Sequence, residues 1–277
     1  GQIETEGKLG QAAFSPDGEH VAFIGAIDIH DPAEGQLMVA RATGGEPTNL
    51  MPGVEGHVNG VAWRDDDTIL YLLDSNVHTQ VGEIAASGGE PNVLIDEGQP
   101  VLLSMSVTDD GEHMAFVGDS PEHPGEVFVG RTGQDPERVT FHNEWLSEVD
   151  LGDQTVHTWT ARDGMELHGV LVHPVDYQHG VVYPLVAVIH GGPEAHERNG
   201  WKTWYSRPGQ YMAAQGYFVW YPNYRGSTGR GYDFTMTSQG DPGGKEFDDV
   251  VDGVNDLIEL GLVEEGRVGI TGGSYGG

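Results

Sequence analysis

The segment Gly272-Gly273-Ser274-Tyr275-Gly276 has the residue types and the spacing of a nucleophilic serine. It matches the pattern G-x-S-x-G, in which a strained turn between a strand and a helix exposes the serine hydroxyl. Glycine is needed two residues before and after the serine because a side chain there would collide with the neighbouring backbone. Ser274 is therefore a candidate nucleophile, with Gly272 and Gly276 supporting its turn. The alternative is an ordinary glycine-rich turn, since the chain contains 43 glycines.

A second segment, His190-Gly191-Gly192-Pro193, has the composition of a loop that stabilises an oxyanion. Hydrolysis of an acyl bond places negative charge on the carbonyl oxygen, and preorganised backbone N–H groups stabilise that charge. We expect the N–H groups of Tyr275 and Gly192 to be the two donors, with Gly192 preferred over Gly191. His190 is expected to support the loop, because in the α/β-hydrolase fold, where the G-x-S-x-G turn occurs, the catalytic histidine follows the serine in the chain.

The same region offers a weaker alternative, a metal site made of His190, Glu194, His196 and Glu197. Their spacing is not H-E-x-x-H, and the polarity of a loop explains these residues better. Residues 226–231 are rich in glycine but lack the lysine and the helix of a phosphate-binding loop. We therefore predict no metal and no cofactor.

Alternating strands and helices must position these residues. Residues 184–189, directly before His190, form a continuous apolar run, which is typical of a strand buried on both faces in a parallel sheet. Residues 267–271, directly before the Ser274 turn, form another strand. The clearest helix is 245–260, whose apolar residues recur every three or four positions. Those residues are Phe247, Val250, Val251, Val254, Leu257 and Ile258. Strands at 154–160, 166–173 and 217–221 and a short helix at 210–215 complete an α/β pattern.

The first half of the chain repeats with a period of about 45 residues. Three glycine-containing turns end at Pro47, Pro91 and Pro136, which lie 44 and then 45 residues apart. Turns at 15–18, 64–67 and 108–111 each precede a short apolar run. Short β runs separated by Asp-Gly and Gly-Gly turns are typical of the four-stranded blades of a β-propeller. We predict three blades between about residues 8 and 140. A propeller closes with about four to eight blades, so we expect further blades before residue 1.

The predicted fold is a multi-domain β plus α/β protein: a partial β-propeller followed by the N-terminal part of an α/β-hydrolase domain. Residues 1–146 would form C-terminal propeller blades, and residues 147–277 the N-terminal part of the α/β-hydrolase domain up to its nucleophile turn.

Three sequence blocks make the chain similar to the prolyl oligopeptidase family, in particular to its acylaminoacyl peptidase and dipeptidyl peptidase branches. In the family's order and approximate spacing they are His190-Gly191-Gly192-Pro193, Tyr221-Pro222-Asn223-Tyr224-Arg225-Gly226-Ser227-Thr228-Gly229 and Gly272-Gly273-Ser274-Tyr275-Gly276-Gly277. The resemblance implies a serine peptidase in which a β-propeller accompanies the hydrolase domain. It also implies that Ser274 is the nucleophile and that Gly192 and Tyr275 supply the oxyanion donors.

Two departures from the family limit what can be transferred. The dipeptidyl and prolyl branches have a tyrosine that helps to hold the oxyanion, whereas this chain has His190, which favours the acylaminoacyl-like branch. The triad aspartate and histidine of the family follow the serine, and both are absent from this chain, which stops at Gly277. We therefore expect an inactive fragment of a longer peptidase.

The charge balance is strongly acidic, with 44 acidic and 13 basic residues and a formal net charge of −31. Nucleic acid is therefore a poor partner. At molar salt the Debye length is about 3 Å, so repulsion among surface carboxylates is mostly screened. We expect the cytoplasm of a salt-adapted organism. The chain has no cysteine, and neither a signal peptide nor a membrane span is visible, although a leader could precede residue 1.

The function predicted from the sequence is hydrolysis of short peptides through an acyl-enzyme on Ser274. One alternative is an esterase or lipase of the same fold, and another is a propeller interaction protein without catalysis. The sequence does not show whether the protein is an exopeptidase or an endopeptidase, which residues it prefers or whether it forms a homo-oligomer.

Overall fold

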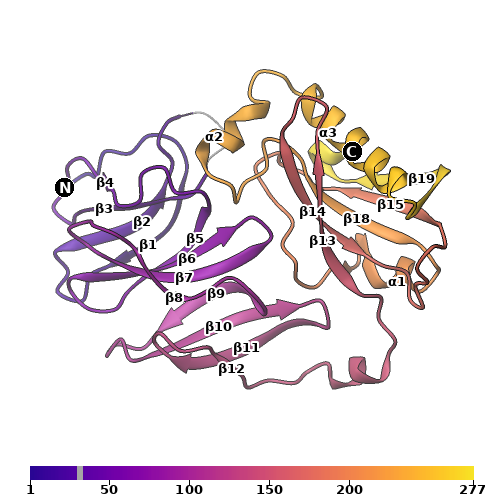
Figure 1. The fold of residues 1–277 in the computed structure, drawn as a ribbon. Helices are drawn as coiled ribbons and strands as arrows, with labels where there is room; N and C mark the ends of the chain where they lie inside the picture. Colours follow the sequence, from indigo (N-terminus) through magenta and orange to yellow (C-terminus); the bar gives the residue numbers. More distant parts are fainter. Residues whose placement is uncertain (30–33) are drawn as a thin grey trace. The chain divides into compact units, whose positions relative to one another are not determined.

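The computed structural model describes residues 1–29 and 34–277, which form two compact units (Figure 1). Unit 1 comprises Gly1–Asp119, Gly125–His142 and Thr228–Asp233. Unit 2 comprises Ser120–Pro124, Asn143–Ser227 and Phe234–Gly277.

Unit 1 contains three sheets of four strands, and neighbouring strands in each sheet are antiparallel and consecutive in the chain. The first sheet has β1 (Leu9–Phe14), β2 (His20–Gly25), β3 (Gln36–Arg41) and β4 (Thr48–Asn49). The second has β5 (His57–Trp63), β6 (Thr68–Ser75), β7 (His78–Ala85) and β8 (Asn92–Ile95). The third has β9 (Val101–Val107), β10 (His113–Ser120), β11 (His123–Arg131) and β12 (Glu137–Arg138). These sheets coincide with the three predicted repeats, while their membership of a propeller stays a prediction.

The repeated Asp-Gly motif forms the turn between the first two strands of the first and third sheets. In the first sheet the Ser15 hydroxyl donates to Asp17 Oδ1 over 2.5 Å, and the Glu19 N–H donates to the same oxygen over 2.9 Å. In the third sheet the Thr108 hydroxyl donates to Asp110 Oδ1 over 2.5 Å. A side chain that caps its own turn fixes the hairpin locally, which is why the motif recurs at the sheet period.

Apolar clusters join the three sheets of unit 1. One cluster joins the first and second sheets and includes Leu37, Val58 and Tyr71. Another joins the second and third sheets through Leu72, Leu102 and Phe116. Burial between sheets therefore stabilises strands that are too short to be stable alone.

Unit 2 is built on a five-stranded mixed sheet in the order β13-β14-β18-β15-β19. Its strands are β13 (Gln154–Thr160), β14 (Glu166–Val172), β15 (Tyr183–Ile189), β18 (Phe218–Asn223) and β19 (Val263–Gly272). β13, β14 and β18 pair antiparallel, whereas β18, β15 and β19 pair parallel. The predicted strands are all present, and β19 begins four residues earlier than predicted.

Short elements precede, connect or follow these strands. They are the 3₁₀ helices η1 (Glu144–Glu148), η2 (Met236–Ser238) and η3 (Ser274–Gly276), the two-residue strands β16 (Thr203–Trp204) and β17 (Arg207–Pro208), and the helices α1 (Gly209–Ala213) and α2 (Tyr232–Thr235).

The longest helix, α3 (Lys245–Glu259), packs against the sheet of unit 2. Leu257 and Val250 join the sheet residues Trp159 and Trp220 in one core. A Cβ on Gly253 would lie 2.3 Å from the Trp220 ring, so glycine allows the helix to approach the sheet closely. The helix confirms the predicted element, but its buried face includes Glu246 and Asp249, while Phe247 is 62% exposed.

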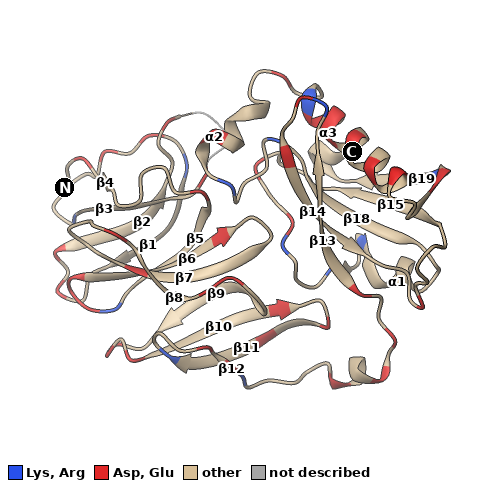
Figure 2. Ribbon diagram, in the orientation of Figure 1, with Lys and Arg blue, Asp and Glu red and all other residues tan. Residues whose placement is uncertain are grey.

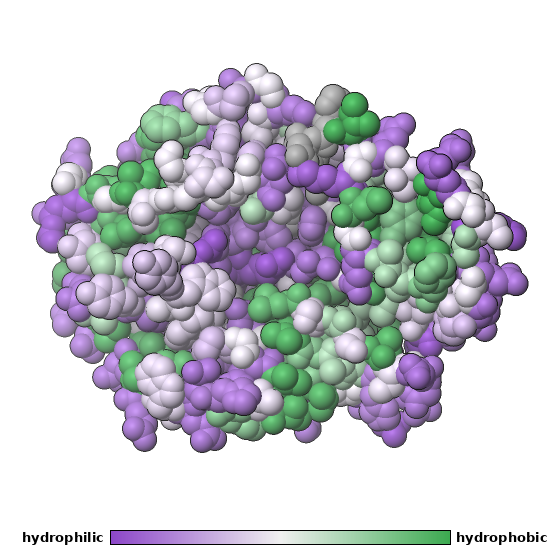
Figure 3. Space-filling model, turned by 180° about the vertical axis from the view of Figure 1, so that it is seen from behind, coloured by the Kyte–Doolittle hydropathy of each residue, from purple (hydrophilic) through white to green (hydrophobic). Residues whose placement is uncertain are grey.

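Acidic residues occur along the ribbon of both units and are more numerous than basic ones (Figure 2). The face shown in Figure 3 mixes polar residues with apolar patches. Exposed apolar side chains of the third sheet include Val117, Val127 and Val129. No helix among residues 1–29 and 34–277 is long and apolar enough to span a membrane.

Candidate active site

Ser274 lies two residues beyond the end of β19 in a backbone conformation that is rare for its residue type. Its φ is +57°, in the left-handed region, and the preceding Gly273 is extended. A non-glycine residue in a sparsely populated conformation costs of order 1–3 kcal/mol and marks a functional turn when the surroundings hold it there. The backbone of Ser274 therefore has the geometry of the predicted nucleophile turn.

The glycines around Ser274 are required by contacts with neighbouring backbone. A Cβ on Gly272 would lie 1.9 Å from the carbonyl oxygen of Gly276. A Cβ on Gly276 would lie 2.3 Å from the carbonyl oxygen of Ile189. A Cβ on Gly273, by contrast, would meet no atom within 4 Å, so only the two flanking positions of the motif demand glycine.

The glycine loop after β15 lies directly beside this turn. β15 and β19 are parallel neighbours, with Ile189 opposite Gly272, so the segments that follow both strands leave the sheet at the same edge. A Cβ on Gly191 would lie 3.1 Å from the Cβ of Ser274. Gly192 has φ +128°, which favours glycine. The structure thus brings the loop and Ser274 together.

His190 is buried and both of its ring nitrogens have partners. Nε2 lies 2.9 Å from the Ser227 hydroxyl and Nδ1 lies 2.9 Å from the carbonyl oxygen of Gly191. The ring stacks on Tyr224, with centroids 4.3 Å apart. Burial lowers the pKa of His190, so the ring is neutral near pH 7. These contacts suit a residue that supports the loop.

Glu197 forms a second buried centre after the glycine loop. Its carboxylate accepts hydrogen bonds from Lys202 Nζ over 2.7 Å and from Arg207. Burial alone would raise the pKa of Glu197, but the two cations lower it below its usual range. Because two cations already hold this carboxylate, it is unsuited to ligate a metal with His190.

Among the described residues, one cluster has ligand atoms close enough to one another to bind a metal ion, and this cluster lies in unit 1. It consists of Asp110, Glu112 and His113. All three are exposed in the hairpin turn of the third sheet. Exposed acidic groups of this kind are common without a metal, so the group carries no functional argument.

Sequence reasoning missed the residues that tie these segments to α3. The Tyr275 hydroxyl donates to Glu246, and the Arg225 guanidinium donates to Asp249. Tyr224 and Arg225 lie in the second of the three family blocks, and the sequence predicted no role for either residue. The signal that could have found them is the pair of carboxylates three residues apart on the apolar side of an amphipathic helix.

The strand order, the strained serine and the adjacent glycine loop are typical of hydrolases of the α/β class that carry a serine at the nucleophile turn. Comparison with known proteins agrees with this class. The model of the prolyl oligopeptidase family matches residues 203–277. An uncharacterized peptidase, YuxL, of Bacillus subtilis is 31% identical over 218 residues, which cover 78% of this chain and 32% of YuxL. Dipeptidyl-peptidase 5 of Porphyromonas gingivalis is 28% identical over 281 residues, which cover 99% of this chain and 40% of the relative.

Solved structures share the fold over nearly the whole chain. The acylaminoacyl peptidase of Pyrococcus horikoshii has a TM-score of 0.80 at 20% identity, covering 99% of this chain and 42% of that protein. Dipeptidyl peptidase 4 of Porphyromonas gingivalis has a TM-score of 0.74 at 21% identity, covering 96% and 37%. The chain spans between 32% and 42% of the length of these four proteins. It belongs to the prolyl oligopeptidase family of serine peptidases.

Proposed function

We propose that the protein hydrolyses short peptides through an acyl-enzyme on Ser274. The observation that carries this proposal is the position of Ser274, which is held at φ +57° beside the glycine loop that follows β15. The serine oxygen attacks the scissile carbonyl carbon while a base takes its proton. The C–N bond then breaks, the amine leaves with that proton, and water hydrolyses the resulting ester.

The negative charge of the tetrahedral intermediate would be held by the backbone N–H groups of Gly192 and Tyr275. Gly192 lies in the loop that follows β15 and Tyr275 in the turn that follows β19, so the two donors lie beyond the ends of neighbouring parallel strands. Such donors stabilise the transition state because they need no reorganisation when the charge forms.

The base and its acidic partner are proposed to lie in sequence that follows Gly277, in the order that the family resemblance implies. His190 is unsuited to the role of base because both of its nitrogens are engaged and its ring is buried. We expect residues 1–277 alone to react poorly with a fluorophosphonate probe. Strong labelling that depends on Ser274 would contradict this and would implicate His190.

We further propose that the three sheets of unit 1 are blades of a β-propeller that limits substrates to short or unfolded peptides. Their consecutive antiparallel order and the shared fold of the acylaminoacyl peptidase support this. The strong negative charge supports a salt-rich cytoplasm as the place of action.

The test uses the full-length protein and a panel of N-acylated peptides, peptides with a free N-terminus and simple esters. Ser274→Ala should lower kcat about 10⁶-fold on the preferred substrate, because members of a triad act as a unit. Ser87→Ala, at an exposed serine in a turn of unit 1, is the matched control and should leave kcat unchanged. Peptide hydrolysis that survives Ser274→Ala within tenfold would refute the proposal, and turnover of esters alone would favour an esterase.

A further inference from the structure

Two carboxylates lie on the buried face of α3, one turn apart. Glu246 is 4% exposed and Asp249 is fully buried. Residues three apart share one face of a helix, so both carboxylates point from α3 towards the segments that carry the candidate site. Their neighbours on this face, Val250, Gly253 and Leu257, pack as an ordinary core.

Glu246 holds the turn that contains the candidate nucleophile. The hydroxyl of Tyr275, the residue after Ser274, donates to Glu246 Oε1. The N–H of Gly243 donates to the same carboxylate oxygen over 2.5 Å and to the Tyr275 hydroxyl over 3.2 Å. The hydroxyl end of the Tyr275 side chain is thus fixed by Glu246 of α3 and by Gly243, two residues before the helix.

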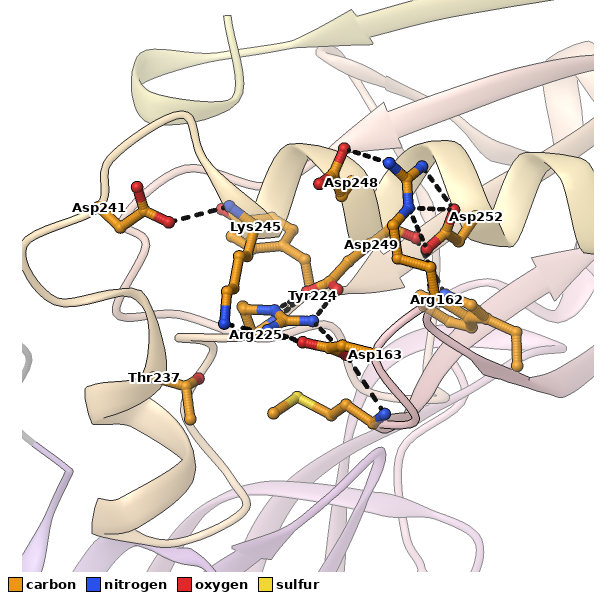
Figure 4. A network of polar contacts seen from close by, with 12 residues as sticks. Arg162, Asp163, Tyr224, Arg225, Thr237, Asp241, Lys245, Asp248, Asp249 and Asp252 are labelled. Carbon is orange, nitrogen blue, oxygen red and sulfur yellow. Dashed lines mark hydrogen bonds and ion pairs between the residues drawn. The ribbon is translucent and has the colours of Figure 1, made fainter.

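Asp249 holds the other segment through two residues after β18. It accepts hydrogen bonds from the Arg225 guanidinium, over 2.8 Å from Nε and 2.6 Å from Nη2 (Figure 4). It also accepts the backbone N–H of Arg225 over 2.9 Å. The neighbouring Tyr224 donates its hydroxyl to the carbonyl oxygen of His190 over 2.7 Å. Asp249 is therefore linked to the first peptide of the glycine loop.

Packing alone does not explain these carboxylates. A buried charged group is costly unless it is paired and hydrogen-bonded, and an apolar residue of similar size would fill the same space without that cost. Glu246 Oε2 is buried and has no hydrogen-bond partner among the described residues. A buried polar atom without a partner costs about 1–3 kcal/mol and calls for an explanation.

We propose that Glu246 and Asp249 are positioning residues, through which α3 sets the two backbone N–H donors of the oxyanion site. Glu246 acts through Tyr275 on the donor after Ser274, and Asp249 acts through Arg225 and Tyr224 on the loop that contains Gly192. One rigid helix then fixes the spacing between donors that belong to different segments. This inference rests on the proposed function, because it assigns the donors of the same reaction.

The first test removes single hydroxyl groups from the full-length protein. Tyr275→Phe and Tyr224→Phe should each lower kcat about 10-fold. This loss is smaller than the roughly 10²–10³-fold caused by removing a whole oxyanion donor, because the donor is still present and only its position is less well fixed. KM should stay within about twofold, because the oxyanion forms only in the transition state. Glu259→Gln, which removes an exposed carboxylate from the same helix, is the control and should leave kcat unchanged.

Pairs of variants distinguish positioning from general damage to the fold. The double variant Tyr275→Phe, Glu246→Gln should have a kcat no lower than that of the slower single variant. Both changes disrupt the same hydrogen bond, between the Tyr275 hydroxyl and Glu246, so their effects should not add. Across the variants, the rate of fluorophosphonate labelling of Ser274 should fall together with kcat. The melting temperatures of the variants should not correlate with these rates. Unchanged kcat in both tyrosine variants, or losses that follow melting temperature or KM, would overturn the inference. Activity that survives Ser274→Ala would instead overturn the proposed function and this inference with it.

Discussion

Arg225→Met should destabilise the protein severely, because it removes the guanidinium from a buried ion pair. Arg225 is almost fully buried and donates to Asp249 over 2.8 and 2.6 Å and to Asp163 over 2.8 and 3.0 Å. Asp249 has no solvent exposure, so its carboxylate cannot be rehydrated in place. Breaking a buried pair by removing one partner costs about 3–5 kcal/mol, since the remaining charge is uncompensated. We expect a loss of that size in the free energy of unfolding.

Arg162→Met is the matched control, because it removes the same group from a surface network. Arg162 also donates to two carboxylates of α3, those of Asp248 and Asp252, but its side chain is 53% exposed (Figure 4). Exposed ion pairs contribute about 0–1 kcal/mol and are screened by salt. The two variants therefore compare one chemical change at two depths of burial.

The assay is urea unfolding of the full-length variants, followed by tryptophan fluorescence. Trp159 and Trp220 lie in the core beneath α3, so their emission reports on this unit. In molar potassium chloride the loss caused by Arg162→Met should vanish and the loss caused by Arg225→Met should persist. Equal losses for the two variants would refute the argument from burial.

Three further predictions follow from the same geometry and charge. Gly276→Ala should lower kcat by at least about 100-fold, because its Cβ would lie 2.3 Å from the Ile189 carbonyl oxygen, whereas Gly273→Ala has free space and should keep most of its activity. The hydrogen bonds from Arg225 lower the pKa of Asp163 from 3.8 to about 2. Asp163 therefore stabilises the fold above about pH 4, this contribution is lost as the pH falls towards 2, and Asp163→Asn should flatten acid unfolding in that window. Finally, the net charge of −31 predicts a melting temperature that rises from dilute buffer to molar potassium chloride, and a flat or falling series would reject salt adaptation.

Local patterns in the sequence predicted the elements of the fold well. The three sheets of unit 1 were predicted from turns that cap themselves, such as Ser15 with Asp17, because such turns need no distant partner. The apolar run before His190 became β15, since a strand buried on both faces is apolar throughout. The strand order of unit 2 was not predicted, because pairing between β14 and β18 depends on contacts across about fifty residues of chain.

The helix α3 was predicted from its apolar spacing, but its buried face follows that spacing only in part, for a physical reason. Val250 and Leu257 are buried, whereas Phe247 is 62% exposed and the carboxylates Glu246 and Asp249 are buried. The spacing rule assumes that apolar side chains point inward. It fails here because Tyr275 and Arg225 supply the partners that allow two carboxylates to be buried.

Carboxylates in this protein therefore have two roles that composition alone cannot separate. Most acidic side chains are at least partly exposed, so their mutual repulsion depends on salt. Glu197, Glu246 and Asp249 are buried and have partners that salt screens only weakly. If positioning of the oxyanion donors depends on Glu246 and Asp249, the geometry of the site is independent of the negative charge on the surface. A chain can then accumulate surface acid without disturbing the contacts that orient Ser274 and the loop beside it.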